Sequence, residues 1–224
     1  MKPYWLPLLP RADIELVVWS VEDDIDHGGA ERFATLFRAT WALIPAADRR
    51  ALLRYWADQR RQRSPSPSGR PAPRVPFVEL CNGKSDFERS PGGKVRAQTN
   101  IDGSTLTFGA SRLPRRDANV KSIVAHEIAH VRLIAAGCDL WNNRPADHGD
   151  AAVDYCLSPV ETAADVLVNA WGLDAYLGLE RRVSGRRIRA VIERNPGHPA
   201  SRWLERYLRR CGDQAVPGAG VDPP

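Results

Sequence analysis

The chain has 224 residues, 43% of them hydrophobic, so it is long enough to bury a substantial core in one domain or in two small ones. No stretch reaches the roughly eighteen apolar residues of a membrane-spanning helix. Because prolines interrupt the first ten residues, we expect no secretory signal there. The formal net charge of +5 says little about partners by itself. Four scattered cysteines fit a reducing cytoplasm, where we expect the protein to be located.

Residues 1–61 are predicted to form an N-terminal helical support segment. The largely apolar stretch from Ile14 to Trp19 is compatible with a short strand or with the start of a helix. Helices are predicted over residues 31–41 and 46–60, because large apolar side chains recur there at helical spacing. We expect these side chains in the core: Phe33, Leu36, Phe37, Trp41, Leu52, Leu53 and Trp56.

The composition changes abruptly at residues 62–74, which are rich in proline, serine and arginine and predict an exposed linker or long loop. Beyond it, the stretches from Val75 to Leu80 and from Ser104 to Phe108 have strand character. The linker therefore separates the support segment from a second part, residues 75–211. The last residues, 212–224, are rich in glycine, proline and alanine, and we expect a disordered tail.

A helix is predicted between Asp117, near plausible N-cap residues, and Gly137, a plausible C-terminal stop. It carries an HExxH pattern from His126 to His130. Two histidines four residues apart project from one helix face and can bind one metal ion together. Zinc suits imidazole nitrogen, and a site with three protein ligands leaves a position for water. Glu127 can then take a proton from the water that attacks a carbonyl and deliver it to the leaving amine, so the pattern predicts peptide-bond hydrolysis.

The alternative is a buried helix whose two histidines only form hydrogen bonds with core groups. Against it, this stretch resembles the zincin metallopeptidases, whose active-site helix carries HExxH. The resemblance implies that His126 and His130 are zinc ligands and that Glu127 is the general base. In zincins the strand before this helix commonly forms a sheet edge that pairs with substrate, and the segment from Thr105 to Phe108 is in the place to do so. Arg132 departs from the usual apolar pattern, so we expect the end of this helix to be more exposed.

A third zinc ligand is needed downstream. The segment from Ser158 to Asp165 is similar to the ExxAD segment of gluzincins, including the HtpX-like peptidases. The resemblance implies that Glu161 binds zinc and that Asp165 orients a zinc-bound histidine, and a ligating histidine normally does donate its other ring N–H to such an acceptor. The same residues also spell a capping box with Pro159 at the first helical position, so Glu161 could instead satisfy the helix start.

His148 is the alternative third ligand. It is followed by a glycine, and this His-Gly pair resembles the one that supplies the third zinc ligand in SprT-like peptidases. The cysteine pairs of the zinc ribbon that often accompanies that family are missing here.

Arginines make the segment from 181 to 210 strongly basic, which could serve to bind nucleic acid, acidic protein surfaces or membrane headgroups. Because no aromatic-rich recognition motif accompanies them, we favour a solvated arginine face over a nucleic-acid site.

These observations predict an α+β, zincin-like domain that is mainly helical with a small sheet, preceded by the N-terminal helical segment. The expected activity is that of a zinc metalloendopeptidase acting on polypeptides. The alternative is a regulatory or binding protein on a zincin scaffold, similar to the ImmA/IrrE-like proteins, although the chain shows no helix-turn-helix partner domain. No pattern selects the group that would stabilise the oxyanion among four candidates: His148, Tyr155, Tyr176 and His198.

Overall fold

The fold is taken from a computed structural model that describes residues 4–9, 14–19, 27–62, 76–81, 97–138, 158–175 and 183–211. Several predictions fall outside these ranges: the disordered tail, most of the linker over 62–74, and the candidate residues His148, Tyr155 and Tyr176. None of the described helices is long and apolar enough to cross a membrane.

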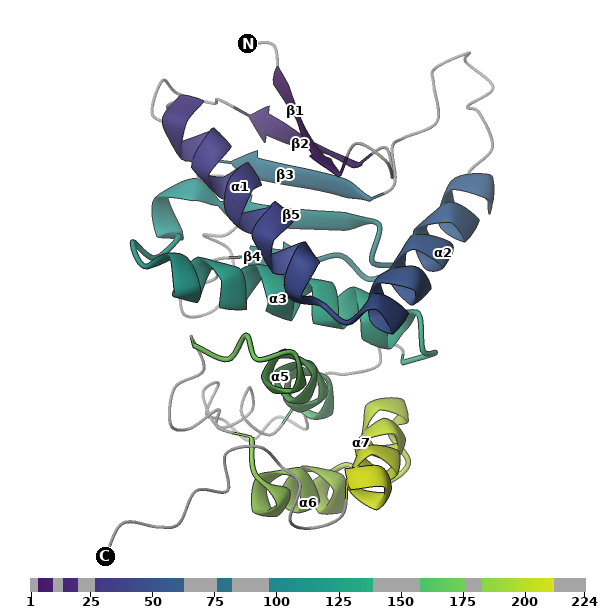
Figure 1. Ribbon diagram of the computed structural model, residues 1–224. Helices are drawn as coiled ribbons and strands as arrows, with labels where there is room; N and C mark the ends of the chain where they lie inside the picture. The colour runs from purple at the N-terminus through teal and green to yellow at the C-terminus, as the bar shows by residue number, and fades with distance from the viewer. Residues whose placement is uncertain are drawn as a thin grey trace, which may run out of the picture.

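Five strands form one twisted sheet in the order β1-β2-β3-β5-β4 (Figure 1). The strands are β1 (Tyr4–Leu9), β2 (Ile14–Trp19), β3 (Phe77–Cys81), β4 (Ala97–Thr99) and β5 (Thr105–Gly109). The three central strands β2, β3 and β5 run parallel, whereas β1 and β4 are antiparallel to their neighbours. The α+β class is therefore confirmed, and the ambiguous segment after Ile14 is a strand.

Two expectations about this sheet need correction. The support segment 1–61 is not only helical, because it contributes β1 and β2 to the same sheet as β3. The predicted edge strand β5 is internal, since it pairs with β3 on one side and with β4 on the other. Among the strands that the structure describes, β4 is the edge next to the HExxH helix. This strand has only three residues, too few to give a recognisable alternating pattern in the sequence.

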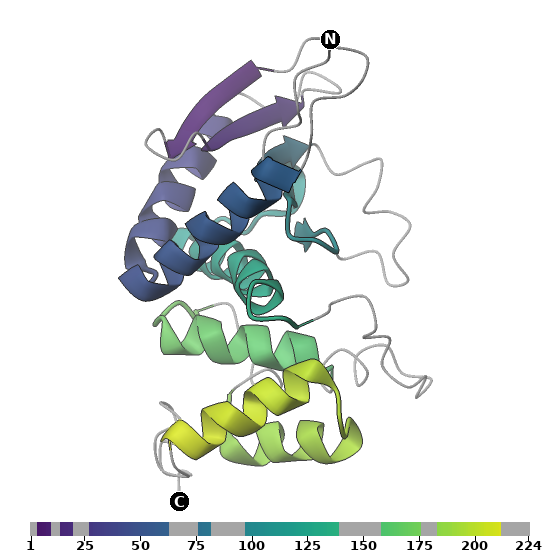
Figure 2. The same cartoon turned by 90° about the vertical axis from the view of Figure 1, so that its right-hand side faces the viewer.

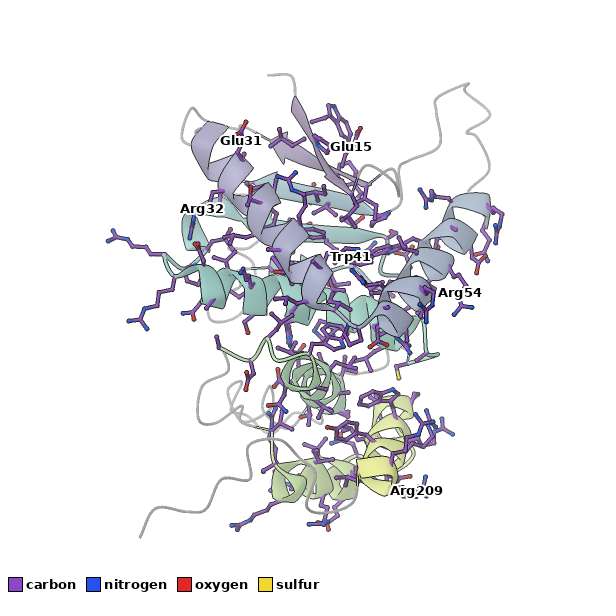
Figure 3. The ribbon with its side chains drawn as sticks, in the orientation of Figure 1. Glu15, Glu31, Arg32, Trp41, Arg54 and Arg209 are labelled. Carbon is purple, nitrogen blue, oxygen red and sulfur yellow. The ribbon has the colours of Figure 1, made fainter. Side chains whose placement is uncertain are left out.

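Helices α1 (His27–Leu43), α2 (Ala46–Gln62) and α3 (Asp117–Ile134) cover one face of the sheet (Figures 1 and 2). A single turn of 3-10 helix, η3 (Ala110–Arg112), leads from β5 towards α3. The ring of Phe33 lies 4.9 Å from that of Phe108 on β5, and Trp41 stacks on Trp56 at 5.9 Å where α1 meets α2 (Figure 3). The aromatic residues predicted for the core are buried there as expected.

Helix α3 runs through the middle of the molecule, and most of its residues are buried. Its N-cap is Arg116, which makes no side-chain capping bond, so the predicted capping role near Asp117 is wrong. Gly137 ends the turn after the helix with a φ of 83°, a conformation that favours glycine. The expected exposure of the end of this helix is met only in part: Arg132 and Ile134 are half-buried, whereas Val131 and Leu133 are fully buried.

The charge of Arg132 is accommodated by an ion pair rather than by exposure. Its Nε donates to Asp48 Oδ1 on α2 at 2.8 Å, and the other oxygen of Asp48 accepts from Trp171 Nε1 at 3.1 Å. One carboxylate on α2 therefore contacts both the end of α3 and Trp171, the C-cap residue of α5 (Pro159–Ala170).

The C-terminal part consists of α5 (Pro159–Ala170), α6 (Gly185–Arg194) and α7 (Pro199–Cys211). Figures 1 and 2 both show α5 against α3 on the side away from β1, with α6 and α7 packed beyond it. Apolar side chains on α6 and α7 complete the packing, among them Ile188, Val191 and Leu204, which are all fully buried. The histidines of α3 therefore meet α5 at the junction of the sheet part and the C-terminal helices.

Candidate metal centre

The two histidines of the HExxH pattern lie one turn apart on α3, with their rings nearly perpendicular at an interplanar angle of 85°. The Nε2 atoms of His126 and His130 are 3.1 Å apart, and the ring centroids are separated by 4.6 Å. Both residues are 7% exposed. Burial of two imidazoles side by side is costly unless their ring nitrogens have partners.

Glu161 on α5 supplies the group that faces both rings. Its Oε2 lies 3.0 Å from His126 Nε2, and its Oε1 lies 3.4 Å from His130 Nε2. The start of α5 directs this side chain, because Ser158 is the N-cap, Pro159 follows it, and the Ser158 hydroxyl accepts a hydrogen bond from the Glu161 backbone N–H at 3.4 Å. The capping interpretation and the ligand interpretation of Glu161 are thus compatible: its backbone N–H meets the cap while its carboxylate meets the histidines.

The ionisation of Glu161 is set by this environment. Burial raises the pKa of the carboxyl, but the charge of His130 and hydrogen bonds from both histidines outweigh that effect and hold the pKa well below its usual range. The group is therefore a carboxylate at neutral pH, which is the form that binds a metal ion.

Asp165 lies one turn further along α5 and is fully buried. Its Oδ1 is 3.3 Å from His126 Nδ1, and its Oδ2 accepts a hydrogen bond from Arg187 Nη2 on α6 at 3.0 Å. When His126 carries its proton on Nδ1, that N–H donates to Asp165, and Nε2 then offers the lone pair that a metal ion would bind. This is the placement that the gluzincin resemblance implied for Asp165.

The described side-chain contact of Glu127 is with the sheet and not with Glu161. Its Oε2 accepts a hydrogen bond from the hydroxyl of Thr99 on the edge strand β4 at 2.7 Å, and the same hydroxyl lies 3.1 Å from the Glu127 carbonyl oxygen. Glu127 is 6% exposed. The carboxylate that follows the first histidine is therefore held by the edge strand of the sheet.

The donor atoms fit a metal ion. One atom from each of His126, His130 and Glu161 lies within 4.8 Å of the others, and the three closest pairs are 3.0 to 3.4 Å apart. Two ligand atoms bound to a tetrahedral zinc at about 2.0–2.1 Å are separated by about 3.3 Å. With protons on their ring nitrogens, the two histidines donate to the Glu161 carboxylate; without those protons, the same atoms present lone pairs that a cation can bind. Imidazole and carboxylate together suit a borderline ion such as zinc.

Two polar contacts of the site were not foreseen in the sequence. Thr99 was not identified because β4 was not predicted, and Arg187 was counted among the solvated arginines of the basic segment. The buried aspartate of the ExxAD-like segment could have signalled Arg187, because a carboxylate placed in a core requires a donor nearby. Of the four oxyanion candidates, only His198 is described, and its Nδ1 accepts a hydrogen bond from the backbone N–H of Ala200 at the start of α7.

Comparison of the chain with protein-family models, with curated proteins and with solved structures gives no match. Function is therefore inferred from the geometry of the site.

Proposed function

We propose that the protein is a zinc-dependent peptidase whose metal is held by His126, His130 and Glu161. The observation that carries this proposal is the convergence of ligand atoms from His126, His130 and Glu161, together with a separately held carboxylate, Glu127, that directly follows the first histidine. A merely structural pair of histidines would not require another buried carboxylate at the adjoining position of the helix.

Each residue has a distinct task in the proposed reaction. A bound Zn²⁺ would act as a Lewis acid, polarising a peptide carbonyl and lowering the pKa of a water molecule. Glu127 accepts the proton of the attacking water and returns it to the departing amine nitrogen. Oε2 of Glu127 accepts a hydrogen bond from the Thr99 hydroxyl at 2.7 Å, and the carboxylate keeps further lone pairs with which it can act as the base.

The edge strand supports a polypeptide as substrate. Strand β4 pairs with β5 on one side, and its other side is the edge of the sheet as described. An extended peptide that adds to such an edge is aligned by backbone hydrogen bonds, with little demand on its sequence. Thr99 is part of β4 and contacts Glu127, so a peptide bound along β4 would pass close to the proposed base.

Metal content measured by elemental analysis tests the proposal directly. We expect close to one zinc per chain in the parent protein and little in the His126→Ala variant. The zinc-loaded parent should also cleave labelled casein, and a zinc chelator should stop the cleavage until zinc is added back. No metal in the parent after incubation with zinc would overturn the proposal, as would casein cleavage that the chelator leaves unchanged.

A further inference from the structure

Arg187 connects the proposed metal site to α6, one of the two helices at the C-terminal end of the described chain. It lies in the first turn of α6, where the hydroxyl of the N-cap Ser184 accepts a hydrogen bond from its backbone N–H at 3.2 Å. The fully buried Ile188 and Val191 fasten the same helix to the core. Only 11% of the Arg187 side chain is exposed, which sets it apart from the exposed arginines of this segment.

The guanidinium of Arg187 reaches two side chains of α5. Its Nη2 donates to Asp165 Oδ2 at 3.0 Å and lies 3.2 Å from Thr162 Oγ1. Asp165 uses its other oxygen, Oδ1, towards His126 Nδ1. A single buried carboxylate therefore has one oxygen on the arginine of α6 and the other on a histidine of α3.

This arrangement restricts the Asp165 carboxylate more than a contact with His126 alone would. A carboxylate can rotate about its last bond, and a charge-assisted hydrogen bond to one oxygen fixes the direction of the other. The direction of Oδ1 decides which way the ring of His126 is turned, and hence whether Nε2 points at Glu161 and His130. Groups behind a metal ligand influence metal affinity in this manner.

We propose that Arg187 is a positioning residue of the metal site: through Asp165 it holds the His126 ring in the orientation that binds the ion. This inference rests on the proposed zinc site and adds α6 to the elements that build it. The basic segment is then not uniform. Arg187 belongs to the site, whereas Arg186 and Arg189 beside it are exposed.

Zinc affinity measured by competition with a chromogenic chelator tests the role of Arg187 without any substrate. We expect Arg187→Met to weaken zinc binding by about tenfold or more, as substitutions behind a metal ligand typically do. Arg187→Lys should recover part of the loss, because an ammonium can still donate to Asp165. Thr162→Val, which touches the same guanidinium but leaves Asp165 in place, should bind zinc as the parent does.

A second readout separates positioning from simple stabilisation of α6. Ile188→Ala removes buried apolar contacts from the same helix, so it should lower the unfolding temperature of the metal-free protein while leaving zinc affinity unchanged at a temperature where the variant is folded. The visible spectrum of the cobalt-substituted protein should change in Arg187→Met but not in Ile188→Ala, because only the former alters the ligand field.

The outcomes distinguish this inference from the proposed function. A parent protein that binds no zinc overturns both. A parent that binds zinc, together with an Arg187→Met variant of equal affinity and unchanged cobalt spectrum, overturns only the role of Arg187. An equal loss of zinc affinity in Ile188→Ala would also overturn it, since general loosening of α6 would then suffice. If Arg187→Met does not fold, Arg187→Gln takes its place under the same criteria.

Discussion

The two sides of the histidine pair differ in what their carboxylates contact. On the side of the sheet, the Glu127 carboxylate of α3 accepts a hydrogen bond from Thr99 of β4. On the side of the C-terminal helices, Glu161 and Asp165 of α5 both face the histidine rings. The same chemical group is thus held once by the sheet and once against the rings of the proposed metal ligands.

This difference predicts a division of labour. A carboxylate that is held by a neighbouring hydroxyl and kept off the ring nitrogens remains available as a base. A carboxylate directed at the rings is committed to holding the ion or to orienting its ligands. Changes on the sheet side should therefore lower turnover at full zinc occupancy, whereas changes on the α5 side should lower occupancy first.

The largest effect is expected for Glu127→Gln. The amide keeps the size of the side chain and an oxygen for Thr99, but it cannot accept the proton, so hydrolysis of casein should fall by about 10²- to 10⁴-fold. Zinc content should stay at the parent level because Glu127 is not among the converging ligand atoms. Turnover equal to that of the parent, measured at matched zinc content, would show that Glu127 is not the base.

Glu161→Ala should lower zinc affinity more than turnover. Structural zinc sites bind with about 10–16 kcal/mol over four ligands, so the loss of one ligand corresponds to about 3 kcal/mol, or roughly a hundredfold in affinity. At saturating zinc, turnover should fall less than in Glu127→Gln. The matched comparison is His148→Ala, which should weaken zinc binding less. The reverse order would assign the third ligand to His148.

Thr99→Val sharpens the comparison on the sheet side. Valine keeps the shape of threonine and removes the hydroxyl that donates to Glu127 at 2.7 Å. A hydrogen bond to a charged group contributes about 1.5–3 kcal/mol, and part of that loss should appear as a turnover reduced by about tenfold at unchanged zinc content. Thr99→Ser retains the hydroxyl and serves as the control. A variant that loses zinc instead would mean that β4 supports the ligands rather than the base.

The sequence allowed one side of the site to be predicted more fully than the other. His126, Glu127 and His130 are contiguous on one helix, so helical periodicity alone places them together. Glu161 is 35 residues from His126, and only its resemblance to a known segment suggested that the two meet. The structure brings Glu161 together with His126 and His130, with Asp165 against His126 Nδ1, and Glu127 follows His126 on the same helix.

Thr99 and Arg187 show why the remainder was not predictable. The first belongs to a strand of three residues, too short for a period-two signal to be recognised. The second lies in a run of arginines whose sequence pattern does not distinguish a buried member from an exposed one, because burial depends on how α6 packs against α5. The edge position of β4 likewise follows from strand order, which a single sequence does not encode locally.

The smallest effect is expected for Ser158→Ala, which separates the two tasks of Glu161. The serine hydroxyl accepts from the Glu161 backbone N–H at 3.4 Å, and loss of an N-cap costs about 1 kcal/mol. The unfolding temperature of the metal-free protein should therefore drop by about 2–4 °C, and Ser158→Thr, which retains a capping hydroxyl, should keep most of the stability. Zinc affinity should change by less than about threefold, since the carboxylate still reaches both rings. A loss as large as that of Glu161→Ala would mean that the start of α5, rather than the Glu161 carboxylate, determines how the metal is held.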